Sequence, residues 1–268
     1  MIKRFVLFAL ASLCAGPLGA AAADDPVETA PGHTLYGDPA APDISGLWLG
    51  SRPLAPGHQP QVPPEPGSTV QWFPWPPRLT PAYQKIADER AAARKEGRQL
   101  GDIGKLCLPF GVPRMLAGTL YPNEIVQTPN VVTLFNFGTF PIMIWTDGRP
   151  HPKDLKPSYN GHSIGHWEGD TLHVDTVGIL PATVVEDDTN TPHSARLHVV
   201  TTIRKVAPDV VHVHITLLDE EAFTEPMVIT NILRRKSGPK WQVLDDMSCF
   251  ENNRTMMEKN RPDGFINF

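Results

Sequence analysis

From residue 124 onward the chain consists of short apolar runs, several with alternating polar residues, separated by turn residues. Such runs are typical of β-strands with one buried face. Three pairs of runs are joined by short turns, at 168–170, 207–209 and 236–240. Runs joined this closely must pair antiparallel, because parallel strands need long crossovers. The predicted strands are 125–126, 131–137, 140–146, 164–167, 171–177, 198–206, 210–218, 227–235 and 241–246.

A meander with this many strands usually closes or curls strongly, because closure removes exposed strand edges. We therefore predict a mainly β fold, an antiparallel meander that closes into a lipocalin-like barrel with one peripheral helix. Gly46-Leu47-Trp48 resembles the Gly-x-Trp opening of lipocalin barrels. The helix is expected at Ala82–Glu96, with Thr80 as N-cap, Pro81 at the first helical position and Gly97 as the stop. We expect the barrel to enclose a hollow that receives polar side chains.

The first 23 residues have the pattern of a secretory signal peptide. Lys3 and Arg4 precede an apolar stretch, and small residues at 20–23 form the cleavage region. We therefore expect a periplasmic or secreted protein, and no later apolar run is long enough to predict a membrane span. The remainder is divided into a Pro-rich N-terminal segment, 24–105, with the first strand and the helix, and a β-barrel-like domain, 106–268.

Removal of the signal peptide leaves two cysteines, Cys107 and Cys249. Two cysteines in an oxidising compartment most simply form a disulfide, and two separate buried thiols are the alternative. The mature chain keeps all 29 acidic residues and loses Lys3 and Arg4 from the 24 basic ones, which gives a net charge of −7. Without a basic tract, nucleic acid is not an expected partner. We expect a small-molecule ligand, and the sequence does not indicate the oligomeric state.

Two motifs stand out, TDGRPHP at 146–152 and GHSIGHWEGDTL at 161–172. Shorter motifs accompany them: CLPFGVPR at 107–114, EIVQTP at 124–129, VDT at 174–176 and CFENN at 249–253. Through these motifs, residues 107–253 resemble a large family of uncharacterised exported proteins of Gram-negative bacteria. The resemblance implies export and a β fold, and it transfers no catalytic residue.

The stretch from Asp147 to Asp154 begins at a strand end and contains a restrained histidine. Pro150 and Pro152 hold His151 in an extended backbone. A titrating side chain in a stiff loop is typical of a preorganised site. His151 could act as general acid or base, with Arg149 holding an anionic oxygen. The alternative is a turn stapled by Asp147 and Arg149, with His151 packed against the barrel rim.

Two histidines in the second motif raise the question of a metal site. In a strand His162 and His166 share a face but lie ~13 Å apart, given ~3.3 Å per residue, whereas zinc needs ligands ~2 Å from one point. We therefore expect no metal, and no organic cofactor. The Gly-x-Ser-x-Gly pattern around Ser163 lacks the strand–turn–helix context of a hydrolase nucleophile. Its glycines fit a bulge or a close approach of strands.

These residues predict acid–base chemistry. We expect His151 and His162 to transfer protons, and Arg149 to hold an anion. Asp175 would orient an imidazole or abstract a proton if it faces the barrel interior. The residues expected to bind the substrate are Tyr159, Trp145, His193 and Arg114. The predicted function is a lyase or isomerase that acts on a small aromatic or apolar molecule. The alternatives are a non-catalytic carrier of a small apolar ligand and a structural partner in an envelope complex.

Overall fold

The structure is a computed structural model that describes residues 41–50, 78–98, 100–101, 103–106, 108–117, 122–136, 140–186 and 190–237. The predicted signal peptide and the strand predicted at 241–246 lie outside these residues. Cys107 and Cys249 also lie outside them, so their disulfide stays a prediction.

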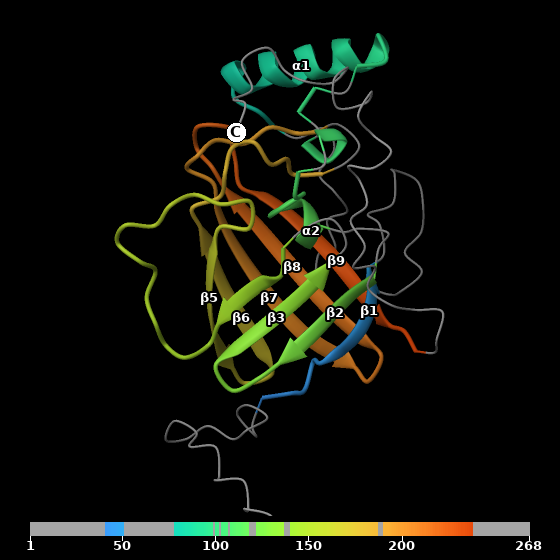
Figure 1. Cartoon of the computed structure of the whole chain (residues 1–268), viewed down its shortest axis with the longest axis vertical. Helices are drawn as coiled ribbons and strands as arrows, with labels where there is room; N and C mark the ends of the chain where they lie inside the picture. Colours follow the sequence, from blue (N-terminus) through green and yellow to red (C-terminus); the bar gives the residue numbers. More distant parts are fainter. Residues whose placement is uncertain are drawn as a thin grey trace, which may run out of the picture.

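The described strands form a closed barrel in which each strand pairs with the next and the first pairs with the last (Figure 1). The strands are β1 (Gly46–Gly50), β2 (Pro122–Gln127), β3 (Val131–Asn136), β4 (Ile142–Trp145), β5 (His162–Glu168), β6 (Thr171–Val177), β7 (His198–Ala207), β8 (Val210–Leu218) and β9 (Met227–Arg235). The predicted lipocalin-like barrel is confirmed. Because β1 pairs with β2 and β9, the predicted domain boundary at residue 106 does not separate the first strand from the barrel.

One joint of the barrel departs from the predicted antiparallel meander. β4 and β5 pair in parallel, through Ile144–Ser163 and Trp145–Ile164, whereas the other strand pairs are antiparallel. A parallel pair requires the chain to return before the second strand begins. Residues 146–161 make this return as a large loop outside the barrel, yellow-green at the left of Figure 1. We call this stretch the return segment.

The alternation along β6 decides which side chains face the barrel interior. Leu172, Val174 and Thr176 are at most 4% exposed, whereas His173 and Asp175 between them are partly exposed. β7 alternates in the same way. Asp175 therefore lies on the outer wall of the barrel and not in its interior, where we expected it to act.

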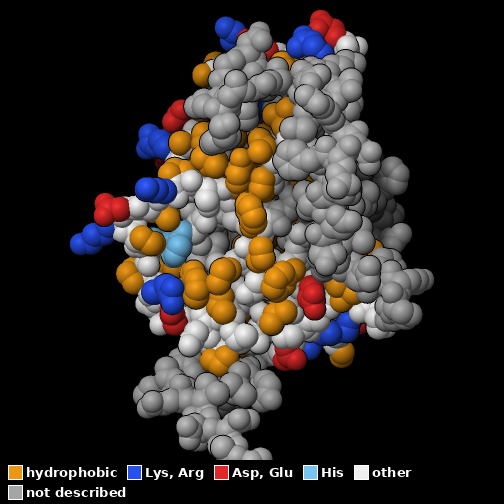
Figure 2. Space-filling view, viewed as in Figure 1, with side chains coloured by type: hydrophobic (Ala, Val, Ile, Leu, Met, Phe, Trp, Pro, Cys, Tyr) orange, Lys and Arg blue, Asp and Glu red, His pale blue; other side chains and the backbone are white. Residues whose placement is uncertain are grey.

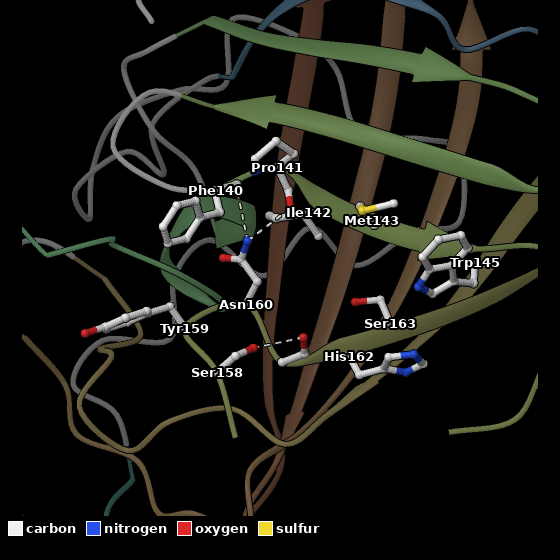
Figure 3. A pocket seen from close by; sticks show the side chains of 11 residues that line it. Phe140, Pro141, Ile142, Met143, Trp145, Ser158, Tyr159, Asn160, His162 and Ser163 are labelled. Carbon is white, nitrogen blue, oxygen red and sulfur yellow. Dashed lines mark hydrogen bonds between the residues drawn. The ribbon is translucent and has the colours of Figure 1, made fainter. Parts of the chain in front are cut away.

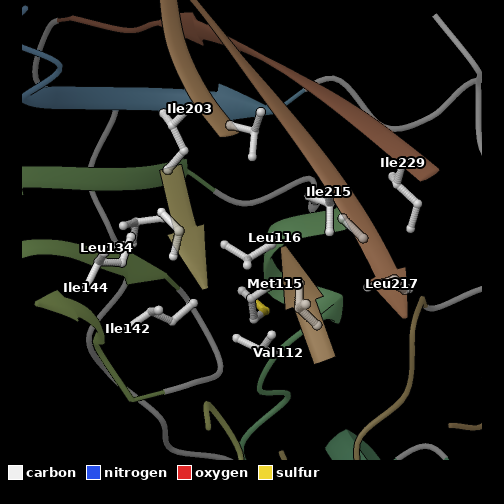
Figure 4. Packing of buried hydrophobic residues seen from close by; sticks show 14 of the residues in the cluster. Val112, Met115, Leu116, Leu134, Ile142, Ile144, Ile203, Ile215, Leu217 and Ile229 are labelled. Carbon is white, nitrogen blue, oxygen red and sulfur yellow. The ribbon is translucent and has the colours of Figure 1, made fainter. Parts of the chain in front are cut away.

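The barrel interior is packed with apolar side chains (Figure 4). A short turn of 3-10 helix, η1 (Ile103–Leu106), is followed by a one-turn helix, α2 (Arg114–Ala117). Val112, Met115 and Leu116 lie among side chains of the strands. Asn231 of β9 donates its Nδ2–H to Leu116 O at 3.1 Å. The chain itself thus fills space that we expected to be hollow.

The peripheral helix is α1 (Pro81–Lys95), which lies across one end of the barrel (Figure 1). Thr80 is its N-cap residue and Pro81 its first residue, as predicted. Thr80 N donates to Ala222 O at 2.9 Å, and the Tyr83 hydroxyl donates to Glu221 Oε1 at 3.1 Å. These bonds tie α1 to the loop between β8 and β9.

None of the helices in the described segments is long and apolar enough to cross a membrane.

Candidate functional site

A chain of hydrogen bonds joins four side chains on the outer wall, over β5, β6 and β7. His151 Nδ1 lies 2.8 Å from His162 Nδ1. His151 Nε2 lies 3.2 Å from Asp175 Oδ1. His198 Nε2 lies 3.0 Å from the same carboxylate oxygen. We call these four side chains the histidine relay.

The register of the barrel brings three members of the relay together. Asp175 pairs with the residue two positions after His162 on β5, and with the residue two positions after His198 on β7. Strand residues two apart point to the same side, so all three side chains face outward. His151 joins them from the return segment. The structure thus unites three of the predicted catalytic residues, on the outside of the barrel.

The hydrogen-bond pattern implies where the protons of the relay lie. An ionised carboxylate only accepts hydrogen bonds, so His151 and His198 each donate an Nε2–H to Asp175. A neutral His151 then has a bare Nδ1, which must accept the Nδ1–H of His162. His162 is left with an unprotonated Nε2. Its lone pair is available to take a proton.

The surroundings of His162 favour its neutral form. Partial burial lowers the pKa of His162 below its ordinary value of 6.5. Electrostatic interactions with His151 and with Arg149 lower this pKa further. At neutral pH the imidazole of His162 is therefore a base. The relay remains in contact with solvent, since the side chains of His151 and Asp175 are 22% and 44% exposed.

A pocket of about 330 Å³ opens beside His162, at the parallel joint of β4 and β5 (Figure 3). One wall is formed by residues 140–143 and Trp145, and the other by residues 158–163. None of these lining residues is Asp, Glu, Lys or Arg. The pocket is therefore suited to an uncharged ligand.

The residues that line the pocket come from both faces of the barrel wall. His162 belongs to the outer face, whereas Ile142 and Ser163 face inward and are 1% and 3% exposed. β4 and β5 are paired at two positions only, which leaves room beside the joint. Asn160 bridges this room by donating its Nδ2–H to Phe140 O at 2.7 Å.

Apolar side chains continue from the pocket over the neighbouring outer wall. Figure 2 shows them gathered over the face that β2, β3 and β4 form. Val126, Phe135 and Met143 are exposed on these strands, and Phe140 at the pocket is 65% exposed. This surface extends the apolar environment of the pocket.

Arg149 lies at the edge of the site, stacked on an aromatic ring. Its Cζ is 3.8 Å from the centre of the Trp145 ring. Its Nε donates to both carboxylate oxygens of Asp147 at 2.9 Å. These hydrogen bonds from Arg149 lower the pKa of Asp147. The stapled turn that we considered as an alternative is therefore present, together with the relay.

Two of the four residues expected to bind substrate line the pocket, namely Trp145 and Tyr159. Arg114 does not line it. Arg114 lies in α2, is 7% exposed, and places its Cζ 3.9 Å from the centre of the Phe110 ring. Its surroundings indicate a packing role.

His193 does not line the pocket either and is 2% exposed. Its Nδ1 donates to Ser194 O at 2.8 Å, and its Nε2 lies 2.7 Å from Thr183 Oγ1. Burial lowers the pKa of His193. Its contacts are those of a neutral histidine that supports the fold.

His166 shares the outer face of β5 with His162 but does not join the relay. Its Nε2 lies 3.0 Å from Glu168 Oε1, and its ring stacks on that of His173 with centres 5.5 Å apart. Within the described segments, no group of three or more His, Cys, Asp and Glu side chains is arranged to hold a metal ion. Ser163 lies within β5, so the Gly-x-Ser-x-Gly pattern is not a strand–turn–helix elbow.

Sequence reasoning missed His198. Its polar side chain between Leu197 and Val199 marks it as outward-facing. The long connection from β6 to β7, however, hides the pairing that places it beside Asp175.

Comparisons of the chain with protein-family models, with curated proteins and with solved structures gave no match. A fold alone does not define an activity, so function is inferred from the chemistry of the site.

Proposed function

We propose that this protein is an enzyme that abstracts a proton from a small, uncharged aromatic or otherwise apolar molecule bound beside His162. One observation carries the proposal: a relay anchored on Asp175 leaves an unprotonated imidazole nitrogen on a residue that lines an apolar pocket. A general base needs a free lone pair and a pKa near or below the working pH. His162 has both.

The relay supports the positive charge that proton transfer creates. When His162 Nε2 takes a proton, its Nδ1–H can pass to His151 Nδ1 across the 2.8 Å hydrogen bond. The charge then lies on His151, whose Nε2–H is already bonded to the Asp175 carboxylate. A carboxylate that orients and stabilises an imidazolium in this way is a general device of acid–base catalysis.

The site favours isomerase or lyase chemistry over hydrolysis. A proton returned to another atom of the substrate gives an isomer, and loss of a neighbouring leaving group gives an elimination. Covalent hydrolysis would need an activated nucleophile. The nearest candidate, Ser163, is hydrogen-bonded to Thr176 Oγ1 at 2.8 Å and to no described histidine.

The lining residues support an uncharged, apolar substrate. A charged group in this pocket would lose water without gaining a charged partner, which is costly. Phe140, Trp145 and Met143 present surfaces that suit a ring.

The test is solvent deuterium incorporation into a panel of neutral aromatic and alicyclic compounds, followed by mass spectrometry. We expect the protein to accelerate exchange in some of them, and His162→Gln to reduce that rate by about 100-fold or more. His166→Gln is the matched control, because His166 lies on the same face of the same strand outside the relay. Equal losses in both variants, or none in either, would contradict the proposal.

A carrier function is the second candidate, favoured by the absence of Asp, Glu, Lys and Arg from the described pocket lining. A carrier would bind an apolar compound equally well with His162→Gln and would exchange none of its hydrogens. Calorimetry combined with the deuterium assay separates the two functions.

We also propose that the mature protein works in the periplasm or the medium, on the evidence of residues 1–23. Expression of the full chain in a Gram-negative host, fractionation and mass measurement test this proposal. We expect a product that begins near Asp24 and has no free thiol, because Cys107 and Cys249 are paired. A full-length cytoplasmic product would contradict the localisation.

A further inference from the structure

We infer that Ser163 binds an oxygen atom of the substrate, and that the substrate class is a neutral ketone or other carbonyl compound on an apolar, ring-bearing skeleton. The assignment of the carbonyl rests on the proposed function. The hydrogen-bonding role of Ser163 rests on the pocket alone.

The hydroxyl groups of Ser163 and Thr176 leave one hydrogen unused. Each hydroxyl carries one hydrogen and can accept two. Their oxygens lie 2.8 Å apart, and this bond uses one of the two hydrogens. Neither hydroxyl has a further hydrogen bond among the described residues. Both residues are buried, at 3% and 0% exposure, so bulk water has little access to the unused hydrogen. An unsatisfied buried donor is costly, and a ligand acceptor would remove that cost.

The position of Ser163 decides which hydroxyl serves the ligand. Ser163 lines the pocket and Thr176 does not. Figure 3 shows the Ser163 hydroxyl pointing toward the middle of the pocket. Thr176 therefore donates to Ser163 Oγ when a ligand is present, and Ser163 donates its own hydrogen into the pocket. The donated bond from Thr176 polarises the Ser163 hydroxyl and strengthens it as a donor.

A carbonyl oxygen is the acceptor that fits the proposed chemistry. An imidazole removes a proton from carbon only where an adjacent group can take up the electron pair. In a ketone the α C–H bond breaks, the proton goes to His162 Nε2, and the electron pair moves to the carbonyl oxygen. A hydrogen bond from Ser163 to that oxygen strengthens as its charge grows, so it stabilises the transition state. Ser163 and His162 both line the pocket, and their side chains leave opposite faces of β5.

The binding test compares 1-tetralone with tetralin, which has the same ring skeleton without the carbonyl oxygen. Calorimetry gives the ratio of their dissociation constants for the full mature chain. We expect the wild type to favour 1-tetralone, and Ser163→Ala to reduce that preference about fivefold, the worth of one neutral hydrogen bond. Ser163→Cys has nearly the same volume and only a weak donor, so it should also lose most of the preference for 1-tetralone.

Thr176→Val is the matched control. It removes the partner hydroxyl but leaves Ser163 its own hydrogen, so the preference for 1-tetralone should remain. The inference is overturned if the wild type shows no preference for the ketone. It is also overturned if Ser163→Ala keeps the preference, or if Thr176→Val loses it to the same extent as Ser163→Ala.

Deuterium exchange at C2 of 1-tetralone separates this inference from the proposed function. If Ser163 sets the ketone preference but the wild type exchanges no faster than His162→Gln, the binding role stands and proton abstraction fails. If His162 is required for exchange but Ser163→Ala keeps the preference, the proposed function stands and the oxygen-binding role fails.

Discussion

The Nδ1 atoms of His151 and His162 lie 2.8 Å apart and share one hydrogen bond. Two nitrogens of the same kind can form such a bond only if one carries a hydrogen and the other does not. The bond therefore exists while at least one of the two imidazoles is neutral. The relay depends on pH for this reason.

Our first prediction concerns the titration of His162. Since burial and nearby positive charges lower the pKa of His162, its midpoint in long-range ¹H–¹⁵N spectra should lie below 6.5. Deuterium exchange of 1-tetralone requires the unprotonated form, so its rate should fall as the pH is lowered through that midpoint. Arg149→Gln should raise the midpoint by removing a positive charge. A midpoint at or above 6.5 that Arg149→Gln does not move would contradict the assignment.

The second prediction concerns Asp175. Asp175→Ala removes the acceptor of two imidazole N–H groups and should slow deuterium exchange by about 10–100-fold, the worth of one hydrogen bond to a charged group. The ¹⁵N spectra should also show loss of the fixed His151 and His162 tautomers. Asp170→Ala is the control, because Asp170 is bonded to Arg204 and Thr171 outside the relay. Similar rates in the two variants would remove Asp175 from the mechanism.

The third prediction concerns the buried His193. Burial lowers its pKa in the folded state, so below pH 6.5 the unfolded chain binds a proton that the folded chain resists. The free energy of unfolding should therefore fall as the pH drops from about 6.5 toward the folded pKa, by at most about 1.4 kcal/mol per pH unit for one proton. Urea unfolding of the wild type and of His193→Gln, compared between pH 7.5 and 5, measures the difference. Equal losses would show that His193 titrates normally.

The fourth prediction concerns the packed interior. Met115→Ala should lower the free energy of unfolding by about 2–5 kcal/mol, because Met115 is 1% exposed inside the barrel. Met143→Ala, on the outer face at 42% exposure, should cost less than about 1 kcal/mol and should weaken tetralin binding. If the two substitutions had equal costs, α2 would not fill the interior as described.

Much of the barrel was predictable because its signals are local. The hairpin at Glu168-Gly169-Asp170 and the start of α1 at Thr80 follow from turn and capping chemistry within a few residues. The parallel joint of β4 and β5 was not predictable in this way. It depends on the path of the return segment, whose residues carry no periodic pattern.

The sequence predicted most residues of the histidine relay, but it did not predict where on the barrel the candidate site lies. His151 and His162 were identified from their motifs, and the structure places them in contact. We expected them inside a hollow. Leu172 and Val174 are apolar and buried, and Asp175 alternates with them along the strand, so the sequence pattern already places Asp175 on the outer face. The packing of Met115 could not be foreseen, since nothing in a four-residue helix indicates that it lies inside a barrel.

The return segment lies outside the hydrogen-bond ladders of the barrel strands apart from one isolated bridge at Ser158. It nevertheless supplies His151 to the relay, and Tyr159 and Asn160 to the pocket. Substitutions within it can therefore alter the site without removing a barrel strand. For protein engineers, a single continuous graft at 146–161 would exchange much of the reaction chemistry while the scaffold is retained.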